Sequence, residues 1–224
     1  MTQDDRWTRY AALAGIVAVL LFVAGGFLAG SPPQPGDPAG RIRDFYIAHR
    51  WTLLFGAYLT GLAASLLLWF LASVRAVLRR AEGGEGVLST TMYAGAIVTT
   101  VVTLVGTAVS AALAFNAQRG DAAVQTLFDA SNLALVFVFF PWALTTASAG
   151  VVLIRTGVLP RWLGWAGLLL AAVFLLSAAG LGMTSGAFAA GSYGSFAAFF
   201  LGMAWFVVLA ALIWRRPGAG RASA

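Results

Sequence analysis

Residues 162–214 read WLGWAGLLLAAVFLLSAAGLGMTSGAFAAGSYGSFAAFFLGMAWFVVLAALIW and contain no charged side chain. An α-helix rises about 1.5 Å per residue, so roughly 20 residues cross the hydrocarbon core of a bilayer. The stretch is therefore too long for one crossing and long enough for two. Glycine and serine cluster at 182–194, where we expect the chain to turn. The stretch thus predicts a helical hairpin in a membrane, with spans at about 162–181 and 193–214.

The rest of the chain has the same apolar composition. Of its 224 residues, 60% are hydrophobic and 10% are charged, and its mean hydropathy of +0.86 is far above that of a soluble domain. No window alternates apolar and polar residues with the period of two that a membrane β-barrel needs. We therefore predict one all-α, polytopic domain over residues 1–224 with six transmembrane helices. The four spans upstream of the hairpin are expected at about 10–30, 51–74, 89–115 and 132–154.

The distribution of arginine predicts the orientation of these spans. All 14 basic residues are Arg; with the N-terminus inside, ten of them fall in the inner segments and four in the outer ones. Because arginine accumulates in cytoplasmic connections, both termini are expected inside. The acidic residues are shared equally between the two sides, so the net charge of +6 lies entirely on the inner side. We interpret it as a membrane-surface charge that faces anionic lipid, and we expect no binding of nucleic acid.

A short interfacial helix is expected in the first outer connection, at about residues 38–49. Pro38 suits the first turn of a helix, and Ile42, Phe45 and Tyr46 recur at helical spacing. This pattern predicts a helix that lies on the outer leaflet with those three side chains in the membrane.

Two interpretations of this outer region stay open. In the first, the helix is a connector that covers the bundle. In the second, charged residues of the outer side form a binding site, in which two arginines reach a carboxylate or a lipid phosphate. One histidine with scattered carboxylates lacks the ligand spacing of a metal site, so no metal is expected. The candidate residues are Arg43, Asp44, His49 and Arg50 with Asp129, and Asp121 from the second outer connection.

Hydroxyl side chains form a polar stripe along the third span. Such stripes usually pack against another helix or hydrogen-bond to a carbonyl of their own helix. The alternative is the lining of a pathway for a ligand or water. The stripe consists of Thr99, Thr103, Thr107 and Ser110.

Two further features concern helix shape and packing. Pro141 is expected to kink the fourth span, because proline has no N–H to donate to the preceding turn. Pairs of small residues four positions apart have the spacing of helix-packing motifs. These pairs are Gly26 and Gly30, Gly61 and Ser65, and Gly182 and Gly186.

The missing residue types limit the possible chemistry. The chain has no Lys, no Cys and one His, which excludes Schiff-base cofactors, thiolate metal sites and bis-histidine haem ligation, so we expect no cofactor. The six windows lack the ionisable residues that ion-coupled transport generally needs. We expect a non-catalytic module that binds lipid or another hydrophobic ligand, or that assembles with a membrane protein partner or a second copy. The alternatives are a small facilitative transporter or channel and, third, a membrane-embedded enzyme that acts on lipid.

The connection between the fourth and fifth spans reads RTGVLPRWLGWAG at residues 155–167. It resembles the signature of a bacterial family of six-helix membrane proteins, a domain of unknown function in which a G-x-L-P-R-x-L-G turn joins spans four and five. The first half of the chain is similar to actinobacterial membrane proteins of unknown function. The resemblance implies a multi-pass protein of the bacterial cytoplasmic membrane and brings no activity with it.

The ten-to-four distribution of arginine gives a testable topology. Reporters fused at six positions along the chain should report alternately outside and inside, with the first outside, because the inner connections hold the excess of arginine. A cytoplasmic signal from the first or third fusion would contradict this topology. The fusion points are Gly36, Arg80, Gly120, Gly157, Ser185 and Gly220.

Overall fold

A computed structural model describes residues 3–182 and 193–215. Within these ranges the chain is all-helical, and six helical segments are long and apolar enough to cross a membrane, as the sequence predicts. The predicted turn at 182–194 lies almost wholly outside the described residues. The helices are α1 (Gln3–Phe27), α2 (Ala39–Ala48), α3 (Arg50–Glu82), α4 (Val87–Asn116), α5 (Asp121–Phe137), α6 (Phe139–Thr156), α7 (Arg161–Ala179) and α8 (Tyr193–Trp214), with a 3-10 turn at Gly180–Gly182 after α7.

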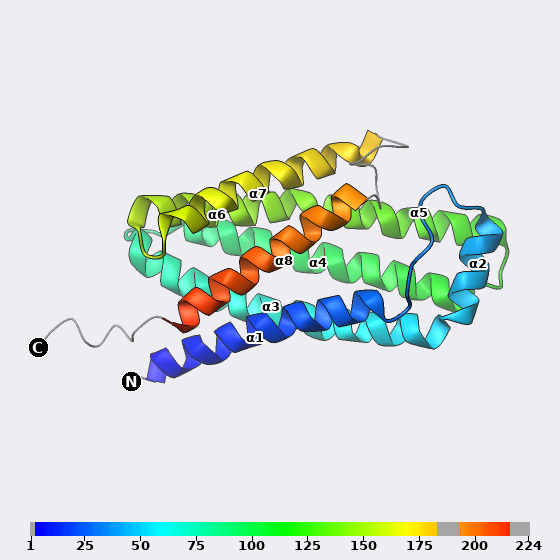
Figure 1. The fold of residues 1–224 in the computed structure, drawn as a ribbon, viewed down its shortest axis with the longest axis horizontal. Helices are drawn as coiled ribbons and strands as arrows, with labels where there is room; N and C mark the ends of the chain where they lie inside the picture. The colour runs from blue at the N-terminus through cyan, green and yellow to red at the C-terminus, as the bar shows by residue number, and fades with distance from the viewer. Residues whose placement is uncertain (1–2, 183–192, 216–224) are drawn as a thin grey trace, which may run out of the picture.

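The long helices run side by side along one bundle axis (Figure 1). Helix α1 begins and α8 ends at the same end of the bundle, which we call the terminal end. At the opposite end, which we call the capped end, the short helix α2 lies across the bundle. Helix α1 packs on α3, α3 on α4, α4 on α6, and α6 on α7, while α8 crosses over the assembly and contacts α1 and α7.

Several helices extend beyond the predicted spans, because an α-helix does not have to end where hydrocarbon ends. Helix α3 continues from the predicted boundary at Val74 to Glu82, giving 33 residues, or about 50 Å. Helix α1 begins at Gln3, several residues before the predicted start at Tyr10, and ends at Phe27. The predicted bounds of the fifth and sixth spans agree with α7 and α8 to within two residues.

The fourth crossing begins earlier than predicted and is interrupted near Pro141. Helix α5 starts at Asp121, and together with α6 it forms a helical segment of 36 residues. The interruption falls at Val138, whose backbone angles stay helical. Because Pro141 has no N–H, the carbonyl of Phe137 cannot receive the usual bond from it. Helix α5 ends at Phe137, whose carbonyl has lost this bond. Pro141 therefore interrupts the hydrogen-bond ladder locally.

Glycines allow three pairs of helices to touch backbone to backbone. A Cβ on Gly56 of α3 would lie 2.7 Å from the carbonyl oxygen of Gly25 in α1. Gly150 of α6 and Gly164 of α7 face each other, and a Cβ on either one would lie 2.7 Å from the carbonyl oxygen of the other. A Cβ on Gly95 of α4 would meet Thr145 and the Pro141 carbonyl of α6. Any side chain larger than hydrogen would therefore push these helix pairs apart.

Two of the three predicted small-residue pairs are not the ones that pack. Nothing lies within 4 Å of a Cβ built on Gly26, Gly30 or Gly61, and Gly186 lies outside the described residues. Ser65 instead donates a hydrogen bond to the Gly61 carbonyl of its own helix, at 3.0 Å. Spacing alone identified the wrong glycines, because it does not state which face of a helix meets a neighbour.

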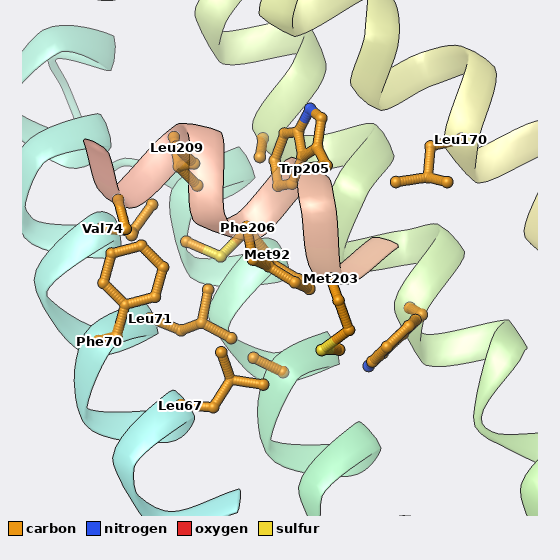
Figure 2. Packing of buried hydrophobic residues seen from close by; sticks show 14 of the residues in the cluster. Leu67, Phe70, Leu71, Val74, Met92, Leu170, Met203, Trp205, Phe206 and Leu209 are labelled. Carbon is orange, nitrogen blue, oxygen red and sulfur yellow. The ribbon is translucent and has the colours of Figure 1, made fainter. Parts of the chain in front are cut away.

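The core is apolar and rich in aromatic side chains. Figure 2 shows α8 side chains, among them Met203 and Phe206, lying against the row from Leu67 to Val74 on α3. The ring of Trp142 on α6 lies 5.1 Å from Phe174 on α7 and 5.9 Å from Phe206, measured between centroids. These contacts connect the fourth, fifth and sixth crossings.

Trp205 anchors α8 to α7. Its indole Nε1–H donates to the carbonyl of Leu163 at 3.0 Å, and the ring packs against Gly167. A buried indole N–H needs such an acceptor, since leaving it unpaired costs free energy. The hydrogen bond therefore sets the position of α8 along α7.

Replacing Gly150 by Ala tests the importance of the glycine contacts. The new methyl group would approach the Gly164 carbonyl to 2.7 Å, so we expect the protein to be destabilised by about 1–3 kcal/mol, as for other overpacked cores. Gly61→Ala is the matched control, because it also lies within a helix but meets no neighbouring atom within 4 Å. Thermal unfolding in detergent should show a lower midpoint for the first variant alone; equal midpoints would contradict the packing argument.

Candidate functional site

The side chains of α2 pack into the protein and not into the membrane. Ile42 is fully buried and Tyr46 is 6% exposed, in a cluster with Leu113 of α4 and with Val124 and Phe128 of α5. The prediction that Ile42 and Tyr46 anchor an interfacial helix in the lipid is therefore wrong. Helix α2 begins at Ala39, one residue later than predicted, and covers the ends of α4 and α5. This position matches the first of the two interpretations, in which the helix is a connector that covers the bundle.

Tyr46 connects α2 to the hydroxyl stripe of α4. Its phenol oxygen lies 3.2 Å from Ser110 Oγ of α4, and its ring packs edge-on against Phe128. Burial raises the pKa of the Tyr46 phenol, and the hydrogen bond to Ser110 offsets part of that effect. The phenol therefore stays neutral at physiological pH and serves as a hydrogen-bonding group.

Arg43 connects α2 to the start of α5. Its Nη1 lies 3.1 Å from Asp121 Oδ1, and its Nε lies 3.2 Å from Asp44 Oδ1. The side chains of Arg43 and Asp121 are 37% and 58% exposed, so solvent weakens the pair. Asp121 is the first residue of α5, with Gly120 at the N-cap position.

The other candidate residues do not join this pair. His49 Nδ1 lies 3.1 Å from the Phe45 carbonyl of the preceding turn. Asp129 Oδ1 accepts a hydrogen bond from Gln125 Nε2 at 3.0 Å, and no ion pair among the described residues joins it to Arg43 or Arg50. Asp129 follows Asp121 by eight residues, about 12 Å along α5. The structure therefore separates the predicted outer site into several local contacts.

Arg50 lies against aromatic rings. Its Cζ is 4.9 Å from the ring centroid of Phe115 on α4 and 5.5 Å from that of Trp51. Both distances fall within the range of cation–π attraction. Its Nε is buried without a hydrogen-bond partner.

The hydroxyl stripe on α4 lies in several environments and does not follow one pathway. Thr107 Oγ1 donates to the Thr103 carbonyl of its own helix at 2.8 Å, and Ser110 contacts Tyr46. Thr99 is buried, and its Oγ1 has no hydrogen-bond partner. Below Pro141, Thr145 Oγ1 donates to the Pro141 carbonyl at 2.8 Å and approaches the Met92 carbonyl of α4 at 3.4 Å. Thr107 thus bonds within its own helix, whereas Ser110 and Thr145 also contact a neighbouring helix.

A polar cluster at the terminal end was not predicted. The carboxylate of Glu82 accepts backbone N–H groups of Leu88 and Ser89, at 2.8 and 2.9 Å, and so caps the start of α4. Arg75 Nη2 donates to Thr90 Oγ1 at 3.3 Å, and Arg75 Cζ lies 5.9 Å from the ring centroid of Tyr93. The Arg75–Thr90 contact joins α3 to α4, and only the antiparallel packing of the two helices brings these residues together.

Two shallow hollows lie on the outside of the described bundle. One, of about 500 Å³, is at the capped end and includes Asn116 and Arg119. The other, of about 300 Å³, is an apolar groove between α1 and α3, which we call the α1–α3 groove. Trp7 and Trp69 meet edge to face in it, at 6.5 Å between ring centroids. The groove is lined by Trp7, Tyr10, Leu13, Ala14, Val17, Leu66 and Trp69.

No family model, curated protein or solved structure matches this chain. The resemblance of residues 155–167 to a family of unknown function therefore stays a prediction. Among the described residues, no three His, Asp or Glu side chains come together in a way that could hold a metal ion.

A double-mutant cycle on Arg43 and Asp121 measures the contact between α2 and α5. We expect Arg43→Ala and Asp121→Ala to show a coupling of up to about 1 kcal/mol in the free energy of unfolding, the range of exposed ion pairs. The parallel cycle of Arg43 with Asp129 should be additive, because Asp129 is bonded to Gln125. Coupling with Asp129 in place of Asp121 would contradict the described geometry.

Proposed function

We propose that this multi-pass membrane protein is a non-catalytic module of the bacterial cytoplasmic membrane that binds a lipid or another hydrophobic molecule. The observation that carries the proposal is the contrast between the inside and the outside of the bundle. Apart from Tyr46 and two tryptophans, the buried side chains of the described residues that carry a polar group are Ser or Thr, seven in number. The interior therefore offers no charged group for catalysis or for ion coupling, whereas apolar hollows and arginines lie on the outside.

The α1–α3 groove supports the hydrophobic-ligand part of the proposal. Its volume of about 300 Å³ is at the lower end of the range of small-molecule sites. Its walls are apolar apart from the polar atoms of Trp7, Tyr10 and Trp69. Tryptophan and tyrosine favour the membrane interface, where one side of the ring is wet and the other apolar. An acyl chain with its polar end at this boundary matches these walls.

Two alternatives have less support. One is assembly with a partner subunit or a second copy, and the other is facilitative transport. Helix α4 exposes Val98, Val101 and Val105 on one side, and lipid can cover such a side as well as protein can. The transport alternative rests on the hydroxyl stripe, in which Thr107 bonds to a carbonyl of its own helix and Ser110 contacts Tyr46.

The test is to purify the full chain in mild detergent and identify bound molecules by native mass spectrometry and by a density map. We expect a lipid or another hydrophobic molecule in the α1–α3 groove. Trp69→Ala should lower its retention about tenfold, equivalent to ~1.4 kcal/mol, because the groove loses one wall. The matched control is Trp165→Ala, which removes an exposed tryptophan of α7 that does not line the groove. A wild-type protein without any bound lipid or hydrophobic molecule would refute the proposal.

A further inference from the structure

Two arginines of α3, Arg50 and Arg75, form no ion pair with any carboxylate of the described residues. The ion pairs found among the described residues use Arg41 and Arg43 of α2, and neither Arg50 nor Arg75 takes part in one. Both lie partly buried against α4. A partly buried charge without a counter-charge is unfavourable. The two positions would therefore be stabilised by an anion from outside the chain.

The surroundings of both guanidinium groups are alike. Arg50 stacks on Phe115 and Trp51, and Arg75 lies over Tyr93 while donating one bond to Thr90. In each arginine, Nε is the guanidinium nitrogen that is buried without a hydrogen-bond partner. Nε is thus enclosed by protein, so an anion would meet the Nη groups: both of them in Arg50, and in Arg75 Nη1 with the Nη2 proton that Thr90 does not accept. Two Nη groups match two oxygens of a phosphate through parallel, charge-assisted bonds.

The spacing of the two arginines matches the thickness of a bilayer. They are 25 positions apart on one uninterrupted helix, which corresponds to about 38 Å at 1.5 Å per residue. A bilayer measures about 40–45 Å with its headgroup layers and about 30 Å without them. Centred on the hydrocarbon, both guanidinium groups therefore fall in the headgroup layers, and a helix tilt of about 20° shortens the separation only to ~35 Å.

The two arginines also share one face of α3. At about 100° per residue, 25 positions come within roughly 20° of seven full turns. This agrees with the contacts, because both side chains reach residues of α4: Phe115 near its end and Tyr93 near its start. A single surface along α3 and α4 thus presents one cation to each headgroup layer.

We propose that this α3–α4 surface binds the phosphate groups of two phospholipids, one in each leaflet, through Arg50 and Arg75. The inference deepens the proposed lipid-binding function and rests on it, but it concerns a different surface from the α1–α3 groove. The tails of such lipids would lie along exposed apolar side chains of α4, such as Val101 and Val105. This apolar flank favours a lipid phosphate over free inorganic phosphate, which has the same charge chemistry but no tails.

The test counts retained phosphatidylglycerol by native mass spectrometry on the full chain in detergent. Wild type should retain two tightly bound molecules at the α3–α4 surface, in addition to any molecule held in the α1–α3 groove. Arg50→Gln and Arg75→Gln should each weaken one of them about tenfold or more, because the fork of charge-assisted donors is lost, and the double variant should lose both. Arg41→Gln is the matched control, since Arg41 is already paired with Asp37 and highly exposed. It should retain both lipids.

Two ligand arms identify the source of the phosphate. Diacylglycerol, which has tails but no phosphate, should not be retained at these positions. Inorganic phosphate in millimolar excess should not displace the phosphatidylglycerol; if it does, the site is one for a free anion and the lipid assignment is overturned. Helicity and elution volume establish that each variant is folded. Should either Gln variant fail to fold, Arg→Lys at the same position keeps the charge but loses the fork, and lipid retention must still fall severalfold.

The outcomes separate this inference from the proposed function. If wild type and the double variant retain the same number of phosphatidylglycerol molecules, the two arginines do not bind lipid phosphate and this inference is overturned. The α1–α3 groove can still hold its ligand in that case. If Arg41→Gln loses lipid as readily as Arg75→Gln, the effect is one of net charge, and the inference is likewise overturned. Absence of any lipid or hydrophobic molecule in wild type would overturn both.

Discussion

The close approach of helix backbones at glycine is the contact on which the rest of the bundle depends. Between lipid-embedded helices the hydrophobic effect gives little attraction, because lipid tails are as apolar as leucine, so dense packing has to hold the helices together. The pairs α1–α3 and α6–α7 each meet at a pair of facing glycines, Gly25 with Gly56 and Gly150 with Gly164. Gly95 brings α4 against α6 in the same way. Helix α8 then packs across the assembly through Trp205 and Phe206.

This packing places polar chemistry at the two ends of the protein. The described interior holds apolar side chains and small hydroxyls, several of which bond to carbonyls of their own helix, such as Thr145 and Thr146. Charged and amphipathic side chains collect at the capped end around Arg43 and at the terminal end around Glu82. The multi-pass bundle thus has an apolar outer surface between two polar ends.

The same residue types differ in role because tertiary contacts assign them. Arg43 and Arg50 have the spacing of one helical face, and the sequence pattern placed them in one site. In the structure they belong to two helices: Arg43 pairs with Asp121, and Arg50 lies on Phe115 and Trp51. Arg75 was counted only as a topological charge, yet it lies over Tyr93 beside Thr90. A sequence pattern gives the face of a helix, whereas the partner on that face depends on how the helices cross.

The sequence by itself determined the all-α class, because backbone N–H and C=O groups in hydrocarbon must form their hydrogen bonds within each helix. It also determined the number of crossings and the bounds of the last two, because a crossing needs about 20 apolar residues. It also predicted a short helix before the second crossing. Only the tertiary structure decided that Ile42 and Tyr46 of this helix are buried in protein, since an apolar face packs equally well on lipid or on neighbouring helices. It likewise decided which glycines meet, because Gly61 and Gly150 both lie within apolar helices and differ only in what stands opposite them.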